Sequence, residues 1–166
     1  PHEIWLRWAG YIIAYSTVLP GLFETSELLE ALGLFKHSPV KPLREARRLY
    51  IPFVISGGAM LAFSMLLPRY CFPLVWLGFI FLLEPANHKL EGKSLLADWE
   101  SGTLRTLYLL LLSGLICGLL WEFWNFWARS KWLYSIPFFD RWRLFEMPLL
   151  GYLGFPPFAL ECYVMY

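Results

Sequence analysis

The order of hydrophobic and polar residues divides the chain into long apolar runs separated by short stretches rich in charged side chains. A helix needs about 20 residues, at about 1.5 Å each, to cross the roughly 30 Å hydrocarbon core of a bilayer. Several runs approach that length and carry few charges. The pattern predicts an all-α, polytopic integral membrane protein, with about five transmembrane helices at residues 4–23, 50–67, 70–83, 104–127 and 147–166.

The shortest run, residues 70–83, leaves the number of crossings open. Its length corresponds to a helix of about 21 Å, which is short for a complete crossing. It either extends through residues 84–88 to form a fifth crossing, or forms a re-entrant segment beside four crossings. We favour five crossings because the run is uninterrupted and apolar.

Two connecting segments near the N-terminus have distinct patterns. In Glu24–Phe35, leucines recur at helical spacing opposite glutamates, which predicts a short amphipathic helix at the membrane surface. The preceding Pro20-Gly21 is expected to end or kink the first helix. Residues 36–48 combine prolines with a cluster of lysines and arginines, which predicts a polar loop leading into the second apolar run.

Composition agrees with the membrane assignment. The 166 residues are 58% hydrophobic and 16% charged, whereas soluble domains have about 45–50% apolar and about 25% charged residues. The formal net charge of +1 gives no basis for binding nucleic acid. We expect one transmembrane domain over residues 1–166, in the bacterial inner membrane or another energy-transducing membrane. Because the chain starts at Pro1 and stops while still apolar, we expect it to be part of a longer protein.

One face of the run 104–127 carries glycines followed by polar side chains. Spacings of 4, 4, 3 and 4 residues place these positions on the same side of a helix. They are Gly114, Gly118, Glu122, Asn125 and Arg129.

Small residues in membrane helices allow the backbones of two helices to approach closely. The glycines of this face and the glycine pair at the centre of the second run are therefore predicted to be helix-packing positions. They are Gly57, Gly58, Gly114 and Gly118.

Carboxylates inside apolar segments are costly, about 2.5–3.5 kcal/mol at a helix centre, and usually face the bundle. A buried carboxyl can stay protonated and act as an acid, and aromatic rings can stabilise positive charge. Three glutamates, Glu122, Glu146 and Glu161, are therefore candidate catalytic residues converging in one aromatic cavity. The structural alternative pairs Glu122 with Asn125 or Arg129 and makes the glutamates at span edges helix caps or partners of loop arginines.

Further buried polar positions are predicted at Glu84, His88, Asn125 and Arg129. Glu84 and His88 are four residues apart, a spacing that can hold a metal on a helix. Pro85 argues against a continuous helix there. We therefore favour an interfacial or capping histidine over a metal ligand.

The motifs of common cofactor and catalytic sites are missing from the sequence. The three cysteines are far apart and form no Cys-x-x-Cys pair, so we expect them to pack as small apolar side chains. A P-loop, a His-Glu-x-x-His motif and a dinucleotide-binding fingerprint are also missing. We expect neither a cofactor nor a metal.

Two short motifs resemble those of a known family. Residues Trp121–Trp124, reading Trp-Glu-Phe-Trp, and Phe145–Pro148, reading Phe-Glu-Met-Pro, are similar to the intramembrane acid motifs of small polytopic carotenoid enzymes of the lycopene-cyclase-like kind. The resemblance covers about the last third of the chain, and the paired glutamates that follow proline in that family are absent. It implies acid/base isomerisation or cyclisation of an isoprenoid without a redox cofactor.

Three functions fit these patterns. The favoured one is a non-catalytic structural or accessory subunit of a larger membrane complex, because the chain is short and lacks a catalytic motif. The second is a membrane enzyme that acts on an isoprenoid or lipid by intramembrane acid/base chemistry. The third is an ion-conducting or transport protein. Expected partners are the lipid bilayer, other membrane protein subunits and a bound lipid or isoprenoid.

Overall fold

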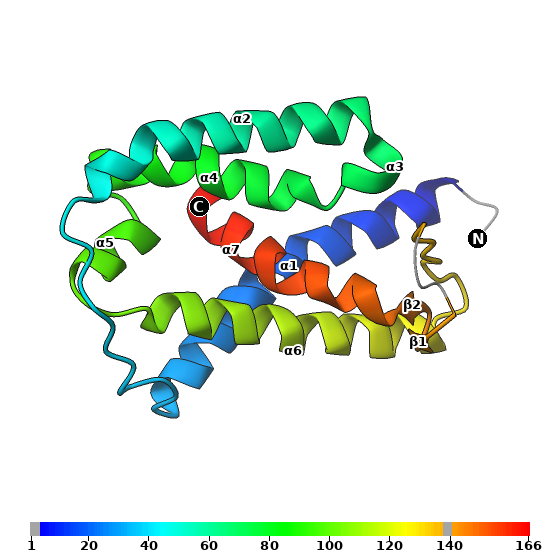
Figure 1. Cartoon of the computed structure of the whole chain (residues 1–166). Coiled ribbons are helices and arrows are strands. Elements are labelled where there is room, and N and C mark those ends of the chain that lie inside the picture. The colour runs from blue at the N-terminus through cyan, green and yellow to red at the C-terminus, as the bar shows by residue number, and fades with distance from the viewer. Residues whose placement is uncertain (1–3, 138–140) are drawn as a thin grey trace.

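The computed structural model describes residues 4–137 and 141–166. Within these residues the chain is all-α apart from one two-stranded antiparallel hairpin (Figure 1). The elements are α1 (Ile4–Ala31), η1 (Ala46–Leu49), α2 (Tyr50–Leu66), α3 (Pro68–Cys71), α4 (Leu74–Lys89), α5 (Leu95–Glu100), α6 (Arg105–Trp127), β1 (Arg143–Leu144), β2 (Met147–Pro148), η2 (Leu149–Gly154) and α7 (Phe155–Met165).

The long helices run between two ends of the molecule (Figure 1). One end contains α5, η1 and the loop after α1, and we call it the α5 end. The other contains α3 and the β1–β2 hairpin, and we call it the hairpin end. Arg105 ties the α5 end together, because its guanidinium donates hydrogen bonds to the Glu30 carboxylate and to the carbonyls of Glu30 and Leu34.

Helices α2 and α4 form a tightly packed antiparallel pair. A Cβ atom added to Gly57 would lie 2.7 Å from the carbonyl oxygen of Gly78, so only glycine permits this approach. The predicted packing role of Gly57 is therefore confirmed. The same prediction for Gly58 is wrong, because Gly58 lies about 100° further round the helix and faces open space.

Helices α6 and α7 pack through the predicted glycine face. A Cβ atom on Gly114 would lie 2.6 Å from the Phe155 carbonyl oxygen, and one on Gly118 would lie 2.2 Å from the Phe155 ring. Both glycines are buried. The structure thus confirms the packing prediction for Gly114 and Gly118 and identifies α7 as the helix that covers them.

The N-terminal region differs from its prediction, because α1 continues through Pro20 to Ala31 as a single helix. Contacts on the C-terminal side of Pro20 hold the chain helical: Leu22 is buried against α7, and the Cys117 thiol donates to the Gly21 carbonyl. Tertiary packing therefore outweighs the backbone hydrogen bond that proline removes. The predicted separate amphipathic helix at Glu24–Phe35 forms the last turns of α1 and a turn after it.

Helix α4 also continues through a proline. It extends from Leu74 through Pro85 to Lys89, so the expectation that Pro85 interrupts the helix is wrong. Asn87 donates a 2.7 Å hydrogen bond to the Val164 carbonyl at the end of α7, and both Glu84 and Pro85 are buried. These contacts fix the last turn of α4 in helical form.

The predicted last span, residues 147–166, is divided. It begins with β2, continues through the 3₁₀ helix η2 and becomes α-helical only at α7, which has 11 residues. Pro148 precedes η2, and Pro156 lies in the first turn of α7, where proline is tolerated.

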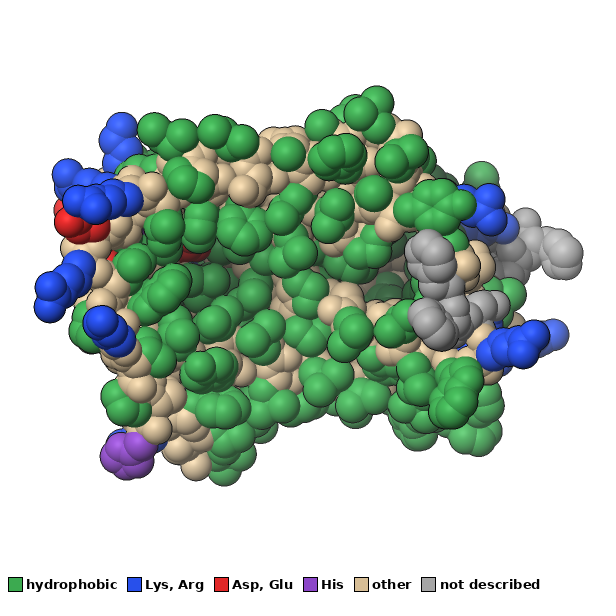
Figure 2. Space-filling model, in the orientation of Figure 1, with side chains coloured by type: hydrophobic (Ala, Val, Ile, Leu, Met, Phe, Trp, Pro, Cys, Tyr) green, Lys and Arg blue, Asp and Glu red, His purple; other side chains and the backbone are tan. Residues whose placement is uncertain are grey.

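Among the described residues, two helical segments are long and apolar enough to cross a membrane, Ala46–Leu66 and Arg105–Trp127. Helices α4 and α7 are shorter, and α1 is long but less apolar. The structure therefore supports two membrane-spanning helices by length and composition, where the sequence predicted about five. The side of the molecule in Figure 2 is covered by hydrophobic side chains, and lysines and arginines gather at the two ends.

Candidate functional site

The polar part of the α6 face is buried, but only as far as the helix extends. Glu122 and Asn125 are buried on the same side as the packing glycines. Helix α6 ends at Trp127, and Ala128 has extended backbone angles. Arg129 therefore lies beyond the helix and is exposed, so its predicted burial and its predicted pairing with Glu122 are wrong.

Asn125 fixes the chain that follows α6. Its Oδ1 accepts a 2.7 Å hydrogen bond from the Trp132 amide, and its Nδ2 donates a 2.9 Å hydrogen bond to the Trp132 carbonyl. The side chain thus pairs with a backbone peptide as a neighbouring strand would. This arrangement turns the loop back over the end of α6 and covers Glu122.

Glu122 is fully buried at the hairpin end. Its Oε2 accepts a long 3.5 Å hydrogen bond from Asn125, and its Oε1 has no direct hydrogen bond to the described residues. The Tyr134 phenol interacts with this carboxyl group and also accepts a 3.3 Å hydrogen bond from the Trp121 indole. Burial, and then the neighbouring Glu122, raise the pKa of Tyr134 above its usual value, so the phenol stays neutral.

Glu146 lies in the turn of the hairpin and is held by Lys131. The Lys131 ammonium lies 2.7 Å from Glu146 Oε1 and also donates a 2.9 Å hydrogen bond to the Phe126 carbonyl at the end of α6. Glu146 therefore joins the hairpin to the loop after α6. This is the predicted structural alternative, with a lysine in place of an arginine.

Glu161 lies on α7, away from the other two candidate acids. Glu122 and Glu161 extend in opposite directions from the contact between Gly114 and Phe155, which places them about 21 Å apart along the helix axes. Glu161 is 7% exposed and forms no hydrogen bond or ion pair with any described residue. The structure brings Glu122 and Glu146 to the same end but does not bring Glu161 to them.

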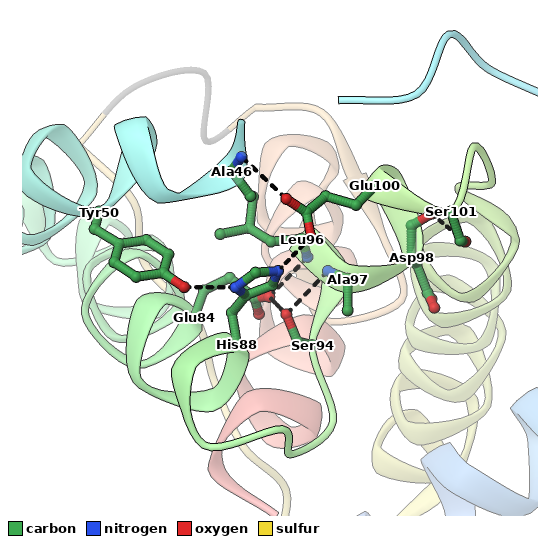
Figure 3. Close-up of polar contacts among 10 residues, drawn as sticks. All are labelled: Ala46, Tyr50, Glu84, His88, Ser94, Leu96, Ala97, Asp98, Glu100 and Ser101. Atoms are coloured by element: carbon green, nitrogen blue, oxygen red, sulfur yellow. Dashed lines mark hydrogen bonds and ion pairs between the residues drawn. The ribbon is translucent and has the colours of Figure 1, made fainter. Parts of the chain in front are cut away.

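At the α5 end, Glu84 holds the start of α5 (Figure 3). Its Oε1 accepts hydrogen bonds from the Ser94 hydroxyl at 2.5 Å and from the Leu96 amide at 2.8 Å. Ser94 is the N-cap residue of α5 and accepts a 3.1 Å hydrogen bond from the Ala97 amide. Glu84 is thus buried as predicted, and its carboxylate supports the N-cap of α5.

A second chain of polar contacts joins three elements at the same end (Figure 3). The Tyr50 hydroxyl lies 2.5 Å from His88 Nδ1, and His88 Nε2 lies 2.9 Å from Glu100 Oε2. Because an ionised carboxylate only accepts, Nε2 carries the hydrogen in that bond. Glu100 Oε1 also accepts a 3.1 Å hydrogen bond from the Ala46 amide. His88 therefore links α2, α4 and α5.

Two open surface cavities lie beside this chain of contacts and share part of their lining. The first, of about 350 Å³, runs between α2 and α4 and is lined mainly by apolar side chains such as Ile51, Val54 and Leu82. The second, of about 410 Å³, has a mixed lining that includes the charged or polar side chains of Arg47, His88 and Glu91, and below we call it the polar cavity. Tyr50 and Lys89 line both cavities. The two cavities are therefore neighbours, and the second carries the charged side chains.

Sequence reasoning missed most of this site. Tyr50, Arg47 and Glu100 were not singled out, because they come from three separate elements and have no characteristic spacing. One usable signal was the basic cluster immediately before the second apolar run. A basic residue at a membrane boundary also acts as a simple anchor, so that signal alone does not identify a site.

Comparison with known proteins adds no assignment. No protein-family model, no curated protein and no solved structure matches the chain. The described residues contain no group of three or more histidine, cysteine or acidic side chains suited to a metal ion. The resemblance to lycopene-cyclase-like enzymes therefore stays a prediction.

Proposed function

We propose that this chain is an integral membrane protein whose α2–α4 pair binds a membrane lipid at the α5 end. The observation that carries the proposal is the junction of an apolar cavity with a polar one at Tyr50 and Lys89. Binding sites for amphiphilic ligands combine mainly apolar walls with a few polar groups. The acyl chain would lie between α2 and α4, and the head group would lie beside His88.

Five crossings are part of this proposal. The segments α1, α2, α4, α6 and η2–α7 all run between the α5 end and the hairpin end (Figure 1). The hydrophobic surface between the two basic ends in Figure 2 supports placing that surface in the hydrocarbon core. The short helices α4 and α7 would be accommodated by local thinning of the bilayer or by interfacial residues at their ends.

The proposal favours lipid binding over acid/base catalysis. An enzyme of the second predicted class needs its acids beside the bound substrate. Glu122 and Glu146 lie at the hairpin end, whereas both cavities described above lie at the α5 end. Lipid binding without catalysis agrees with the non-catalytic subunit predicted from the sequence.

The lipid site is tested by photo-crosslinking the purified full chain with a phospholipid that carries a diazirine in its acyl chain. Labelling is expected to concentrate on residues 50–55 and 82–89. Ala86→Trp fills the apolar cavity and should reduce this labelling. Ala59→Trp, an exposed position on α2 outside the cavity, is the matched control and should not. Equal labelling along all helices would overturn the proposal.

The five crossings are tested by labelling single cysteines with an impermeant maleimide in sealed vesicles, in a variant lacking the three native cysteines. Ser101→Cys lies at the α5 end, and Arg69→Cys and Ser130→Cys lie at the hairpin end. Five crossings predict that the last two are labelled from one side and Ser101→Cys from the other. If Arg69→Cys and Ser101→Cys are labelled from the same side, the re-entrant alternative is correct.

A further inference from the structure

We infer that the head group recognised at the α5 end is the phosphate of an anionic phospholipid, held between Arg47 and Lys89. This inference rests on the proposed lipid site and specifies its ligand class. Arg47 lies in η1, directly before α2, and Lys89 is the last residue of α4. Both line the polar cavity. The two cations therefore line the same cavity at the α5 end of the α2–α4 pair.

Both cations are available to a ligand. The side chains of Arg47 and Lys89 make no hydrogen bond or ion pair with any described residue. The nearby acids are largely engaged: Glu100 by His88 and the Ala46 amide, and Glu45 by Arg48. The charge of Arg47 lowers the pKa of Glu100 less than the Ala46 amide and His88 do. One further acid, Glu91, lines the same cavity.

The chemistry of these groups favours phosphate. An arginine fork binds phosphate oxygens bidentately, and a lysine ammonium adds a compact positive charge. Two cations against one carboxylate leave the cavity with an excess of positive charge. His88 does not supply a further donor, because both of its ring nitrogens are occupied by Tyr50 and Glu100.

The position of the site relative to the apolar groove favours a lipid over a free phosphate. Lys89 lines both cavities, so a phosphate at its ammonium would lie directly at the mouth of the apolar groove. A phospholipid can place its acyl chain in that groove while its phosphate contacts Arg47 and Lys89. Inorganic phosphate would use only the polar half.

The test measures binding of phosphatidylglycerol and phosphatidylcholine to the full chain in neutral detergent by native mass spectrometry. We expect wild type to prefer phosphatidylglycerol. Arg47→Gln and Lys89→Gln should each lower that preference about fivefold, the scale expected for one basic residue at an anionic surface. Arg44→Gln, exposed in the loop just before η1 but outside the cavity, should leave it unchanged. Inorganic phosphate should not compete at concentrations comparable to the lipid.

The remaining variants separate the possible failures. Glu91→Gln removes the one carboxylate that lines the polar cavity and should strengthen phosphatidylglycerol binding; weaker binding would indicate a head group with an ammonium and overturn the inference. An equal loss with Arg44→Gln and Arg47→Gln would indicate general surface attraction and would also overturn it. If both lipids bind equally and Ala86→Trp weakens both, the lipid site stands without phosphate recognition. If Ala86→Trp weakens neither, the proposed function itself fails.

Discussion

The side chain of Asn125 is hydrogen bonded to both the amide and the carbonyl of Trp132, at 2.7 and 2.9 Å. This pairing determines where the chain goes after α6 and keeps Glu122 covered.

Asn125→Ala should lower the free energy of unfolding by about 2–3 kcal/mol, because it leaves both Trp132 groups without their partner. Thermal unfolding in detergent, followed by tryptophan fluorescence, measures the change. Asn87→Ala removes a single hydrogen bond to Val164 and is the matched control, with a smaller expected loss of about 1 kcal/mol. If both variants lose the same unfolding free energy, the two hydrogen bonds to Trp132 stabilise the protein no more than the single bond to Val164.

Ser94→Ala should destabilise the α5 end by about 1–2 kcal/mol, because it removes the N-cap of α5. It also takes away one of the two hydrogen bonds at Glu84 Oε1. A double-mutant cycle with Glu84→Gln should therefore show a coupling energy of about 0.5–3 kcal/mol. If the stability losses of Ser94→Ala and Glu84→Gln simply add in the double variant, the hydrogen bond between Ser94 and Glu84 is contradicted.

The stability of the α5 end should fall at acid pH. The Ala46 amide, and then His88, lower the pKa of Glu100 below its ordinary value of 4.5. A lowered folded-state pKa contributes stability above the unfolded-state value, and this contribution is lost as the pH falls from about 4.5 through the folded-state pKa.

Melting temperatures measured from pH 7 down to pH 3 check this dependence. Glu100→Gln should reduce the decline in that window, while Glu91→Gln, whose side chain has no partner among the described hydrogen bonds and ion pairs, should leave it in place. An unchanged decline in Glu100→Gln would assign the acid sensitivity to another group.

Gly118→Ala should be strongly destabilising, because its Cβ atom would lie 2.2 Å from the Phe155 ring. Overpacking of this kind typically costs about 1–3 kcal/mol. Gly58→Ala faces open space and should raise stability by about 0.5–1 kcal/mol, because alanine favours a helix over glycine. Thermal unfolding of the two variants in the same detergent provides the comparison, and similar values would contradict the assigned packing of α6 on α7.

The parts of the fold that could be predicted are those set by local pattern. The extents of α2 and α6, and the packing of Gly114 and Gly118, follow from apolar length and helical spacing, which are properties of one segment. The extent of α1 was mispredicted because packing of its last turns against α6 and α7 keeps it helical through Pro20. Helix α4 extends through residues 84–88 as the favoured alternative predicted, although Pro85 alone argued against a continuous helix there.

The candidate site was harder to predict for a related reason. Arg129 was placed on the α6 face by its spacing, but the hydrogen bonds of Asn125 to Trp132 turn the chain before that residue. Tyr50, His88 and Glu100 meet only after α2, α4 and α5 are assembled. Their sequence separations carry no periodic signal, so only the three-dimensional arrangement reveals the contact.

The packing of α2 has a consequence for how a ligand would arrive. This helix packs on the rest of the protein mainly through α4, and most of its large apolar side chains are exposed. The apolar cavity beside α2 is therefore open to the outside of the helix bundle, which in the proposed arrangement is the bilayer. A lipid would enter sideways by diffusion within its own leaflet, without leaving the membrane and without separating α1, α6 and α7. Exchange at this site would then depend on the local abundance of lipid species in that leaflet rather than on opening of the helix bundle.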